Sequence, residues 1–183
     1  FEDFKKSHLI VKNPAIPASS PYLKKARLHN IPITSDADIF LHLAPRERVI
    51  GITGTKGKTT TTLLLRHLLG EKRSVAVGVP GTSFFDYFFL KKEPLWIIAE
   101  FSSFDLELVR ASPHGALITS LFPDHLDRYR SFDDYARTKM NLIRFQGAGD
   151  WAMFFSQTAI RRFLPKQQKK RLSTLGLANL PSH

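Results

Sequence analysis

The chain has 183 residues, no cysteine and a formal net charge of +11 at pH 7. A hydrophobic fraction of 43% and a charged fraction of 23% are ordinary for a soluble globular protein, and the absence of cysteine excludes disulfides and thiolate metal sites. No apolar run reaches the roughly 18–20 residues that a membrane-spanning helix needs and no signal peptide is visible, so we expect a cytoplasmic protein with no membrane partner.

The first 44 residues predict a small β-α-β-α segment. Short apolar strands are expected at 8–11 and 31–34. Between them, residues 20–30 form a predicted helix, in which Ser20 suits the cap and Pro21 the first position. A second helix is expected from Ser35 to the residue before Pro45. The segment is small for an independent domain.

From Arg46 onwards, strands alternate with helices. The predicted strands are 48–53, 74–79, 95–101, 116–122 and 150–155, and the predicted helices are 59–70, 131–145 and 157–164. The helix at 59–70 has a leucine face, with Gly70 suited to its C-terminal end. The run at 95–101 is apolar apart from Glu100 near its end, which is typical of a strand buried on both faces. The alternation predicts an α/β fold with a mostly parallel sheet and helices on both faces.

The segment "GITGTKGKTTTT" (Gly51–Thr62) lies between a predicted strand and a predicted helix. Small residues let several backbone N–H groups converge on phosphate oxygens, and the following helix directs its positive end at the same place. Lys58 can supply a mobile charge for the outer phosphates, and the Thr59 hydroxyl can ligate Mg²⁺. The strict phosphate-loop pattern requires glycine where this chain has Ile52, so a glycine turn with a chance Gly-Lys-Thr is the alternative. The predicted nucleotide-binding residues are Gly54, Thr55, Lys56, Gly57, Lys58, Thr59 and Thr60.

Much of the positive charge lies in "RRFLPKQQKKR" (161–171), which contains no acid. A solvated basic face is one interpretation, and a binding site for a polyanion is the other. No aromatic platform or known nucleic-acid motif accompanies this run, so we do not expect nucleic acid as a partner.

The loop G-T-x-G-K-T-T after a strand is similar to the nucleotide loop of the Mur ligases, ATP-dependent amide-bond-forming enzymes whose superfamily includes folylpolyglutamate synthase. Three further stretches follow the order of the Mur ligase sequence. "NPAIPASSPYLKKARLHNIPI" resembles the family's "SPGIP…P…A…GIPV". "IIAEFSSFDLE" and "LFPDHLDRYRSFDDYARTKMNLI" resemble the "E-x-S-S-F-Q-L-E" and "DHLDRH…Y-x-x-x-K" stretches of its D-glutamate-adding branch, the MurD-type ligases.

This resemblance implies a domain organisation. Residues 1–44 would be the C-terminal part of a Rossmann-like N-terminal domain that binds UDP, and 45–183 a P-loop-type central ATP-binding domain. The C-terminal domain of the family, with most of its amino-acid site, would be absent. We therefore expect this chain to be a fragment, and a monomer.

The resemblance also implies a reaction. MurD-type ligases use ATP and Mg²⁺ to add D-glutamate to UDP-N-acetylmuramoyl-L-alanine in the synthesis of the peptidoglycan precursor of the cell wall. The substrate carboxylate takes the γ-phosphoryl group to give an acyl phosphate, and the amine of D-glutamate then displaces phosphate. Charge builds on phosphoryl oxygens, so cations and backbone donors are expected to stabilise it.

Four residues are expected to be catalytic: Lys58 and three that the resemblance assigns to metal ions. Glu100 ends a buried strand and would hold Mg²⁺ together with Thr59. His125 matches the histidine of a second metal site. Lys139 matches a lysine that is carbamylated in MurD, which turns a cation into an anionic ligand. On residue type alone, these would be a strand-end acid, a surface or core histidine and a solvent-facing lysine.

Ser102, Ser103 and Phe104 would line the path of the UDP-muramoyl substrate, although structural packing is the alternative. The sequence also departs from the family. Val79 stands where an asparagine contacts substrate, Ser120 replaces another asparagine, and "FFSQTAI" replaces a polar stretch near the adenine. A nucleotide- or polyanion-binding remnant without ligase activity, or another Mur- or folylpolyglutamate-type ligase, are the alternatives. We expect the isolated chain to bind Mg-nucleotide weakly and to make no amide product.

Overall fold

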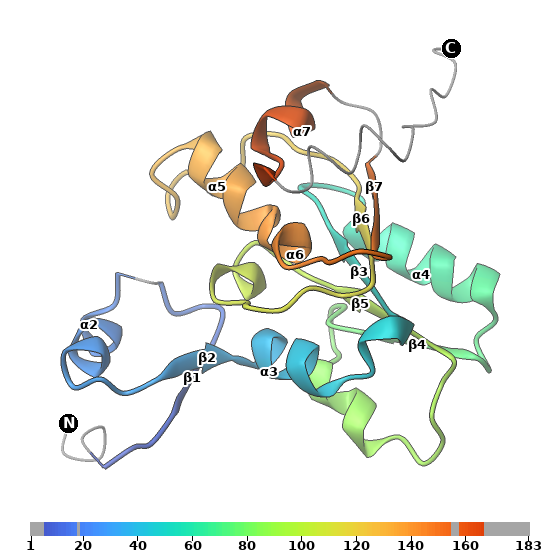
Figure 1. Ribbon diagram of the computed structural model, residues 1–183, viewed down its shortest axis with the longest axis horizontal. Helices are drawn as coiled ribbons and strands as arrows, with labels where there is room; N and C mark the ends of the chain where they lie inside the picture. The colour runs from blue at the N-terminus through green and yellow to red at the C-terminus, as the bar shows by residue number, and fades with distance from the viewer. Residues whose placement is uncertain (1–5, 18, 155–157, 167–183) are drawn as a thin grey trace.

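The computed structural model describes residues 6–17, 19–154 and 158–166 and is built on a five-stranded parallel sheet (Figure 1). The strand order is β4-β5-β3-β6-β7, and a separate two-stranded parallel sheet pairs β1 with β2. The strands are β1 (Ile10–Lys12), β2 (Ile33–Ser35), β3 (Val49–Thr53), β4 (Ser74–Val77), β5 (Trp96–Glu100), β6 (Gly115–Ile118) and β7 (Trp151–Phe154). The predicted α/β class with a mostly parallel sheet is confirmed.

Helices cover both faces of the larger sheet. The α-helices are α2 (Pro21–Leu28), α3 (Asp36–Leu43), α4 (Lys58–Leu69), α5 (Phe132–Lys139), α6 (Asn141–Arg144) and α7 (Thr158–Phe163), and the 3-10 helices are η1 (Arg46–Arg48), η2 (Phe84–Phe89) and η3 (Asp105–Glu107). Helix α4 lies on one face, while α3, α5 and α6 lie on the other (Figure 1). Alternate residues of each strand therefore enter different cores.

The larger core contains an aromatic group that joins α3 to the sheet. Phe40 of α3 is fully buried, and its ring centroid lies 5.4 Å from that of Phe84 and 6.5 Å from that of Phe101. Phe84 and Phe101 stack at 4.9 Å. Such aromatic pairs add to the free energy gained by burying apolar area. Helix α3 is thus part of the main core, although the sequence places it in the segment 1–44.

The core cluster on the α4 side of the sheet is smaller than that on the other side, and α4 buries only part of the predicted leucine face. Leu65 and Leu69 pack on a core cluster that includes Ile50 and Ile98. Three other leucines of the helix, Leu63, Leu64 and Leu68, are exposed. The run of leucines thus surrounds more of the helix than the sheet can cover, and only part of it forms the interface.

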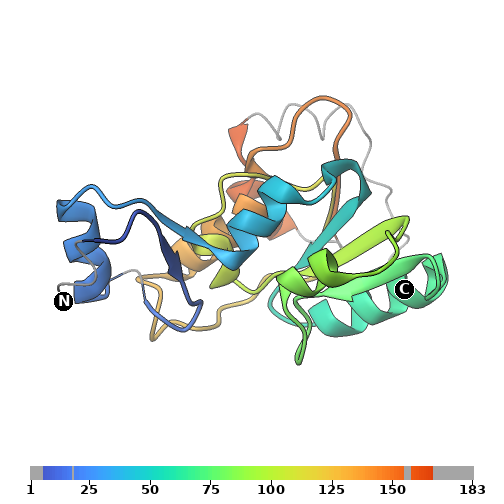
Figure 2. The ribbon, with the colours of Figure 1, turned by 90° about the horizontal axis from the view of Figure 1, so that it is seen from below.

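The N-terminal residues form a small unit beside the main body (Figure 2). The strands β1 and β2 pair in register from Ile10 with Ile33 to Lys12 with Ser35. A separate core cluster of Leu23, Ala26, Ile31 and Ile33 lies under α2. The division into a first domain at 1–44 and a second at 45–183 stays a prediction.

Several predicted elements differ from the structure at their ends, and two of these differences lie near the glycine loop or in the helix that packs beneath it. The strand predicted at 116–122 ends at Ile118, because Thr119 and Ser120 turn to contact the glycine loop. The helix predicted at 131–145 is divided at Met140 into α5 and α6. Its start is as expected, since the Ser131 hydroxyl accepts a hydrogen bond from the Asp134 amide. In the part of the chain that the structure describes, no helix is long and apolar enough to cross a bilayer.

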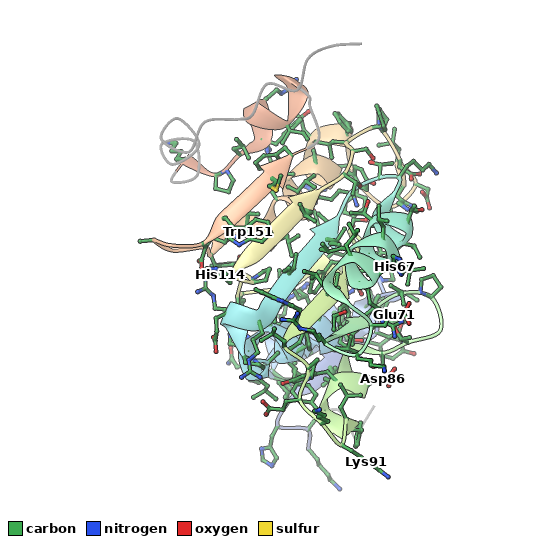
Figure 3. All side chains as sticks on the ribbon, turned by 90° about the vertical axis from the view of Figure 1, so that its right-hand side faces the viewer. His67, Glu71, Asp86, Lys91, His114 and Trp151 are labelled. Atoms are coloured by element: carbon green, nitrogen blue, oxygen red, sulfur yellow. The ribbon has the colours of Figure 1, made fainter. Side chains whose placement is uncertain are left out.

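A buried carboxylate stabilises the N-terminal ends of three strands in the larger sheet. Asp150 accepts hydrogen bonds from Arg46 and from the Gly147 amide, and His114 Nδ1 lies 2.9 Å from its second oxygen. Figure 3 shows His114 and Trp151 together at this end of the sheet. The cluster fixes the N-terminal ends of the strands, away from the glycine loop.

Candidate functional site

The glycine loop lies at the C-terminal end of β3, the central strand of the sheet. Gly57 has φ 84° and precedes α4 directly. Gly54 has φ 155°, and a Cβ there would lie 2.0 Å from Thr119 Oγ1. A side chain at Gly54 is therefore excluded by the neighbouring segment. In open parallel sheets, ligands bind outside the carboxyl ends of the strands, which is where this loop lies.

Thr119 and Ser120 hold the loop from the side of β6. The Thr55 amide donates to the Ser120 carbonyl at 3.0 Å, and the Lys56 amide donates to Ser120 Oγ at 2.9 Å. Thr119 Oγ1 donates to the Lys56 carbonyl at 2.6 Å. Ser120, which departs from the family pattern, thus fixes the loop backbone through its own hydroxyl.

The amides that open α4 are the donors that suit a phosphate group. The first N–H groups of a helix have no partner within the helix, and the helix dipole is positive at that end. Helix α4 begins at Lys58, so Gly57, Lys58, Thr59 and Thr60 supply these groups. The Lys58 ammonium donates to the Thr55 carbonyl at 3.2 Å and so lies over the same loop.

Thr59, in the first turn of α4, and Glu100, at the C-terminal end of β5, lie next to each other. The Thr59 hydroxyl donates to Glu100 Oε1 at 3.1 Å. The other oxygen, Glu100 Oε2, is buried and has no hydrogen-bond partner among the described residues. Burial raises the pKa of Glu100, and the Thr59 hydrogen bond and the Lys58 charge oppose that rise. A buried carboxylate oxygen without a partner is costly, and together with a hydroxyl it is a donor set that fits Mg²⁺.

Lys139 is buried beneath the glycine loop. Its side chain is 1% exposed, and its ammonium donates to the Gly54 carbonyl at 2.8 Å and lies 4.8 Å from the centre of the Tyr135 ring. Burial, and then the nearby charge of Lys58, lower the pKa of Lys139 from 10.5 to about 7. The residue-based interpretation of a solvent-facing lysine is wrong, because α5 directs this side chain toward the loop.

His125 also lies near Tyr135, in a short turn. Its φ of 53° is left-handed, and Asp124 Oδ1 accepts from its backbone amide at 2.9 Å. The His125 ring centroid lies 4.8 Å from Phe104 and 6.1 Å from Tyr135. A left-handed non-glycine residue is uncommon, and such conformations concentrate at functional sites.

Ser102, Ser103 and Phe104 follow Glu100 in a tight turn. The Ser102 amide donates to Asp105 Oδ2 at 2.7 Å, and the Asp105 amide donates to Ser102 Oγ at 3.2 Å. Ser103 is buried, whereas Phe104 is partly exposed next to His125. Ser102 therefore has a structural role in the turn, and Phe104 is the member of the three that borders the site.

The structure thus brings the predicted residues together beyond the C-terminal ends of the strands, in two groups. Lys58, Thr59 and Glu100 form the first, and Lys139 joins it through the loop carbonyl of Gly54. His125 and Phe104 form the second, with Tyr135 between the two groups. Within the described ranges, no set of three or more His, Asp or Glu side chains is arranged to hold a metal ion.

Sequence reasoning missed the residue that links these groups. The Tyr135 hydroxyl donates to Thr55 Oγ1 at 3.1 Å, and this oxygen also accepts from the Phe122 amide at 3.0 Å. Tyr135 lies in the same helix as Lys139, one helical turn earlier. That spacing places both side chains on one face of α5, and it is the signal that points to Tyr135.

The basic run at 161–171 falls only partly within the described residues. Arg162 pairs with Asp133 at 2.6 Å. Lys166 borders a cavity of about 540 Å³ that Arg137 and Arg144 also line. The remaining basic residues from 167 onwards lie outside the described part, so the choice between a solvated face and a polyanion site stays open.

Comparisons with known proteins point to one family. A family model for the Mur ligase middle domain matches residues 52–180. The chain is 40% identical over 154 residues to a UDP-N-acetylmuramoylalanine–D-glutamate ligase of Roseiflexus sp., with 81% of this chain and 33% of the relative covered. It is 37% identical over 153 residues to the ligase of the same name from Koribacter versatilis, with 82% and 34% covered. The chain therefore spans about a third of the length of these relatives.

A solved structure supports the fold. The MurF ligase of Thermotoga maritima, determined in complex with ADP, matches with a TM-score of 0.57 at 17% identity, and the match covers 93% of this chain and 50% of that one. At this identity, the similarity concerns the fold alone. The D-glutamate ligases above are the matches that bear on specificity.

Proposed function

Because the chain belongs to the Mur ligase family, we propose that it carries the ATP-binding part of a ligase that adds D-glutamate to UDP-N-acetylmuramoyl-L-alanine. Two relatives at 37% and 40% identity bear the name of that activity. ATP, UDP-N-acetylmuramoyl-L-alanine and D-glutamate would be its substrates. The alternative of a related ligase with another amino acid is less well supported, since both relatives name D-glutamate.

One observation carries the proposal: the hydrogen bond from Thr59 to Glu100 beside the first turn of α4. It brings a hydroxyl and an unpaired carboxylate oxygen to the place where helix amides converge. The triphosphate would bind to the amides of Gly57, Lys58 and Thr59. The Lys58 ammonium would move from the Thr55 carbonyl to the outer phosphates.

Thr59 and Glu100 would hold Mg²⁺ there. Both are oxygen ligands of the kind that Mg²⁺ prefers, and the buried Oε2 of Glu100 has no other partner within the described part of the chain. When bound, the ion would neutralise negative charge on the phosphate oxygens. The protein's own part is to keep the Glu100 carboxylate ionised and oriented, which the Thr59 hydroxyl does through its hydrogen bond.

Lys139 would form a carbamate. Only a neutral amine reacts with CO₂, and a pKa of about 7 leaves about half of the Lys139 side chains neutral at neutral pH. The ammonium first loses one proton; the neutral nitrogen then forms a bond to the CO₂ carbon and releases a second proton, so that the cation is replaced by an anion. With His125, this anion would serve a second metal site, in agreement with the roles that the family resemblance implies.

The remaining chemistry is the transfer itself. The carboxylate of the UDP-muramoyl substrate would attack the γ-phosphorus and release ADP, forming an acyl phosphate. The amine of D-glutamate would then attack the acyl carbon, and phosphate would leave. Lys58 and the α4 amides would stabilise the charge that develops on the phosphoryl oxygens, while Phe104 would border the substrate path.

Nucleotide binding with and without Mg²⁺ tests this function. We expect calorimetry to detect weak binding of ADP that Mg²⁺ strengthens, and Glu100→Gln to abolish the Mg²⁺-dependent gain without changing binding in EDTA. Glu71→Gln, which removes an exposed carboxylate elsewhere on the chain, is the matched control. Absence of nucleotide binding in the unsubstituted chain would refute the proposal.

The full reaction is tested separately by phosphate release. We expect no phosphate release from the isolated chain, because it spans about a third of the length of its relatives. Release that requires both UDP-N-acetylmuramoyl-L-alanine and D-glutamate would show that these residues are sufficient for ligation.

A further inference from the structure

Four side chains from distant parts of the sequence form a largely buried polar cluster near the second group of site residues. They are Lys12 of β1, Glu107 of η3, and Arg128 and Tyr129 of the turn that follows His125. We call this set the Glu107 cluster. Glu107, Arg128 and Tyr129 belong to two of the three stretches on which the family resemblance was based, and Lys12 directly precedes the third. None of the four has an assigned role.

Glu107 is the centre of the cluster. Its Oε2 accepts from Lys12 Nζ at 3.0 Å and from Arg128 Nη2 at 3.1 Å. Its Oε1 accepts from Arg128 Nε at 3.1 Å and from the Tyr129 hydroxyl at 3.3 Å. The side chains of Lys12, Glu107 and Arg128 are 1%, 10% and 12% exposed. Two parallel bonds from one guanidinium to one carboxylate give a fixed relative orientation as well as attraction.

Arg128 also binds the proline-rich loop of the N-terminal segment. Its Nη2 donates to the carbonyls of Pro14 at 2.7 Å and Ile16 at 3.1 Å, and its Nη1 donates to that of Ala15 at 3.2 Å. Lys12 donates to the Ile16 carbonyl at 3.1 Å as well. Arg128 therefore fixes the loop at 13–16 to the main body, and Lys12 adds a further hydrogen bond to the same loop.

The face of the same guanidinium reaches the candidate site. Arg128 lies 4.1 Å from the centre of the Phe104 ring. The Phe104 ring is nearly parallel to that of Tyr129, at 9° and 6.2 Å, and lies 4.8 Å from that of His125. Within the described residues, Glu107 forms no hydrogen bond or ion pair with His125; it is linked to Phe104 and His125 through Arg128 and Tyr129.

We propose that Glu107 and Arg128 are positioning residues, which hold Phe104 and His125 in place and fix the 13–16 loop beside them. A buried ion pair adds little net stability compared with well-packed apolar residues. What this cluster supplies is a single orientation, because Glu107 accepts four hydrogen bonds and Arg128 cannot rotate without losing several of its own. The value of that orientation for catalysis rests on the proposed function; the orientation itself does not.

Nuclear magnetic resonance of the His125 ring tests the proposal without any ligand. Phe104 shifts the His125 ring protons through its ring current, and His125→Gln identifies their signals. We expect Glu107→Gln to remove at least half of that shift, although Glu107 forms no hydrogen bond or ion pair with His125 within the described residues. The signals of Trp96 and Trp151, which pack on the α4 side of the sheet, should not move. Glu71→Gln, with the same change of charge at an exposed site, should leave His125 unchanged.

An unchanged His125 signal in a folded Glu107→Gln protein would overturn the proposal, even if the melting temperature falls. If that variant does not fold, Arg128→Lys gives the same test, because lysine keeps the charge but cannot bind Glu107 and the loop carbonyls together. The same loss of shift is expected, and an unchanged signal again overturns the proposal. A failure of the parent chain to bind nucleotide would instead refute the proposed function and leave this result standing.

Discussion

Replacing Lys139 by methionine should remove a large part of the pH dependence of stability. The pKa of Lys139 falls from 10.5 to about 7 on folding, because burial and the Lys58 charge disfavour the ammonium. Between these values the unfolded chain binds a proton that the folded chain has lost, so stability rises with pH. The penalty is complete below pH 7 and disappears above the unfolded pKa. Each pH unit adds about 1.4 kcal/mol, which amounts to about 2 kcal/mol between pH 7 and pH 9 once partial titration at pH 7 is included.

Urea unfolding followed by tryptophan fluorescence measures this slope. The parent chain and Lys139→Met are compared at pH 7, 8 and 9 in CO₂-free buffer, so that the amine stays free. The methionine variant should lack the increase of about 2 kcal/mol. Lys91→Met, at an exposed site, should keep it. Equal slopes for the parent chain and Lys139→Met would show that the amine is not held in a desolvated site, and the basis for its carbamylation would fail.

Three further substitutions test other parts of the structure by the same unfolding assay. Gly54→Ala should cost about 2–3 kcal/mol and abolish nucleotide binding, since the new methyl carbon would overlap a hydroxyl oxygen across the loop. Gly81→Ala, which also has a positive φ (87°, against 155° at Gly54) but open space around it, should retain binding. Equal losses of binding would contradict the steric argument. Asp150→Asn should cost about 2–4 kcal/mol at pH 7. Burial raises the pKa of Asp150, but its hydrogen bonds, first that from Arg46, lower the pKa overall. The parent chain should therefore lose stability as the pH falls through the folded pKa, and the asparagine variant should lose less stability in acid. Parallel stability profiles of the two proteins in acid would be inconsistent with this. Phe40→Ala should cost about 3–5 kcal/mol, because the side chain is fully buried among aromatic rings; a cost below about 1 kcal/mol would mean that α3 is not part of the main core.

Local sequence signals were sufficient for the fold class. The strands of the larger sheet are continuous apolar runs, and the glycine loop lies between a strand and a helix, as the structure confirms. The exposed side of α4 could not be predicted in the same way. A run of leucines looks apolar in sequence whichever side the sheet covers, and only the packing of Leu65 and Leu69 on the sheet decides which leucines are buried.

The candidate site was predictable where one local motif supplies its residues. Lys58 and Thr59 follow from the loop, and Glu100 from the end of its strand. The support of the loop by Ser120 depends on hydrogen bonds between segments 64 residues apart, and the Glu107 cluster on a contact across 95 residues. Periodicity and spacing carry no information about such pairs, and so these residues were not expected to contribute.

The central place of β3 also determines when the loop can take shape during synthesis. Its partners, β5 and β6, lie at 96–100 and 115–118, so β3 has neither neighbour when it first leaves the ribosome. The Gly54 carbonyl can accept its hydrogen bond from Lys139 only after that residue, which lies further along the chain, has been synthesised. Pairing over such separations is slow, and the nascent chain must keep an apolar strand unpaired for much of its translation. A substitution that unfolds α5 should therefore also disturb the glycine loop, although the two are 85 residues apart in the sequence.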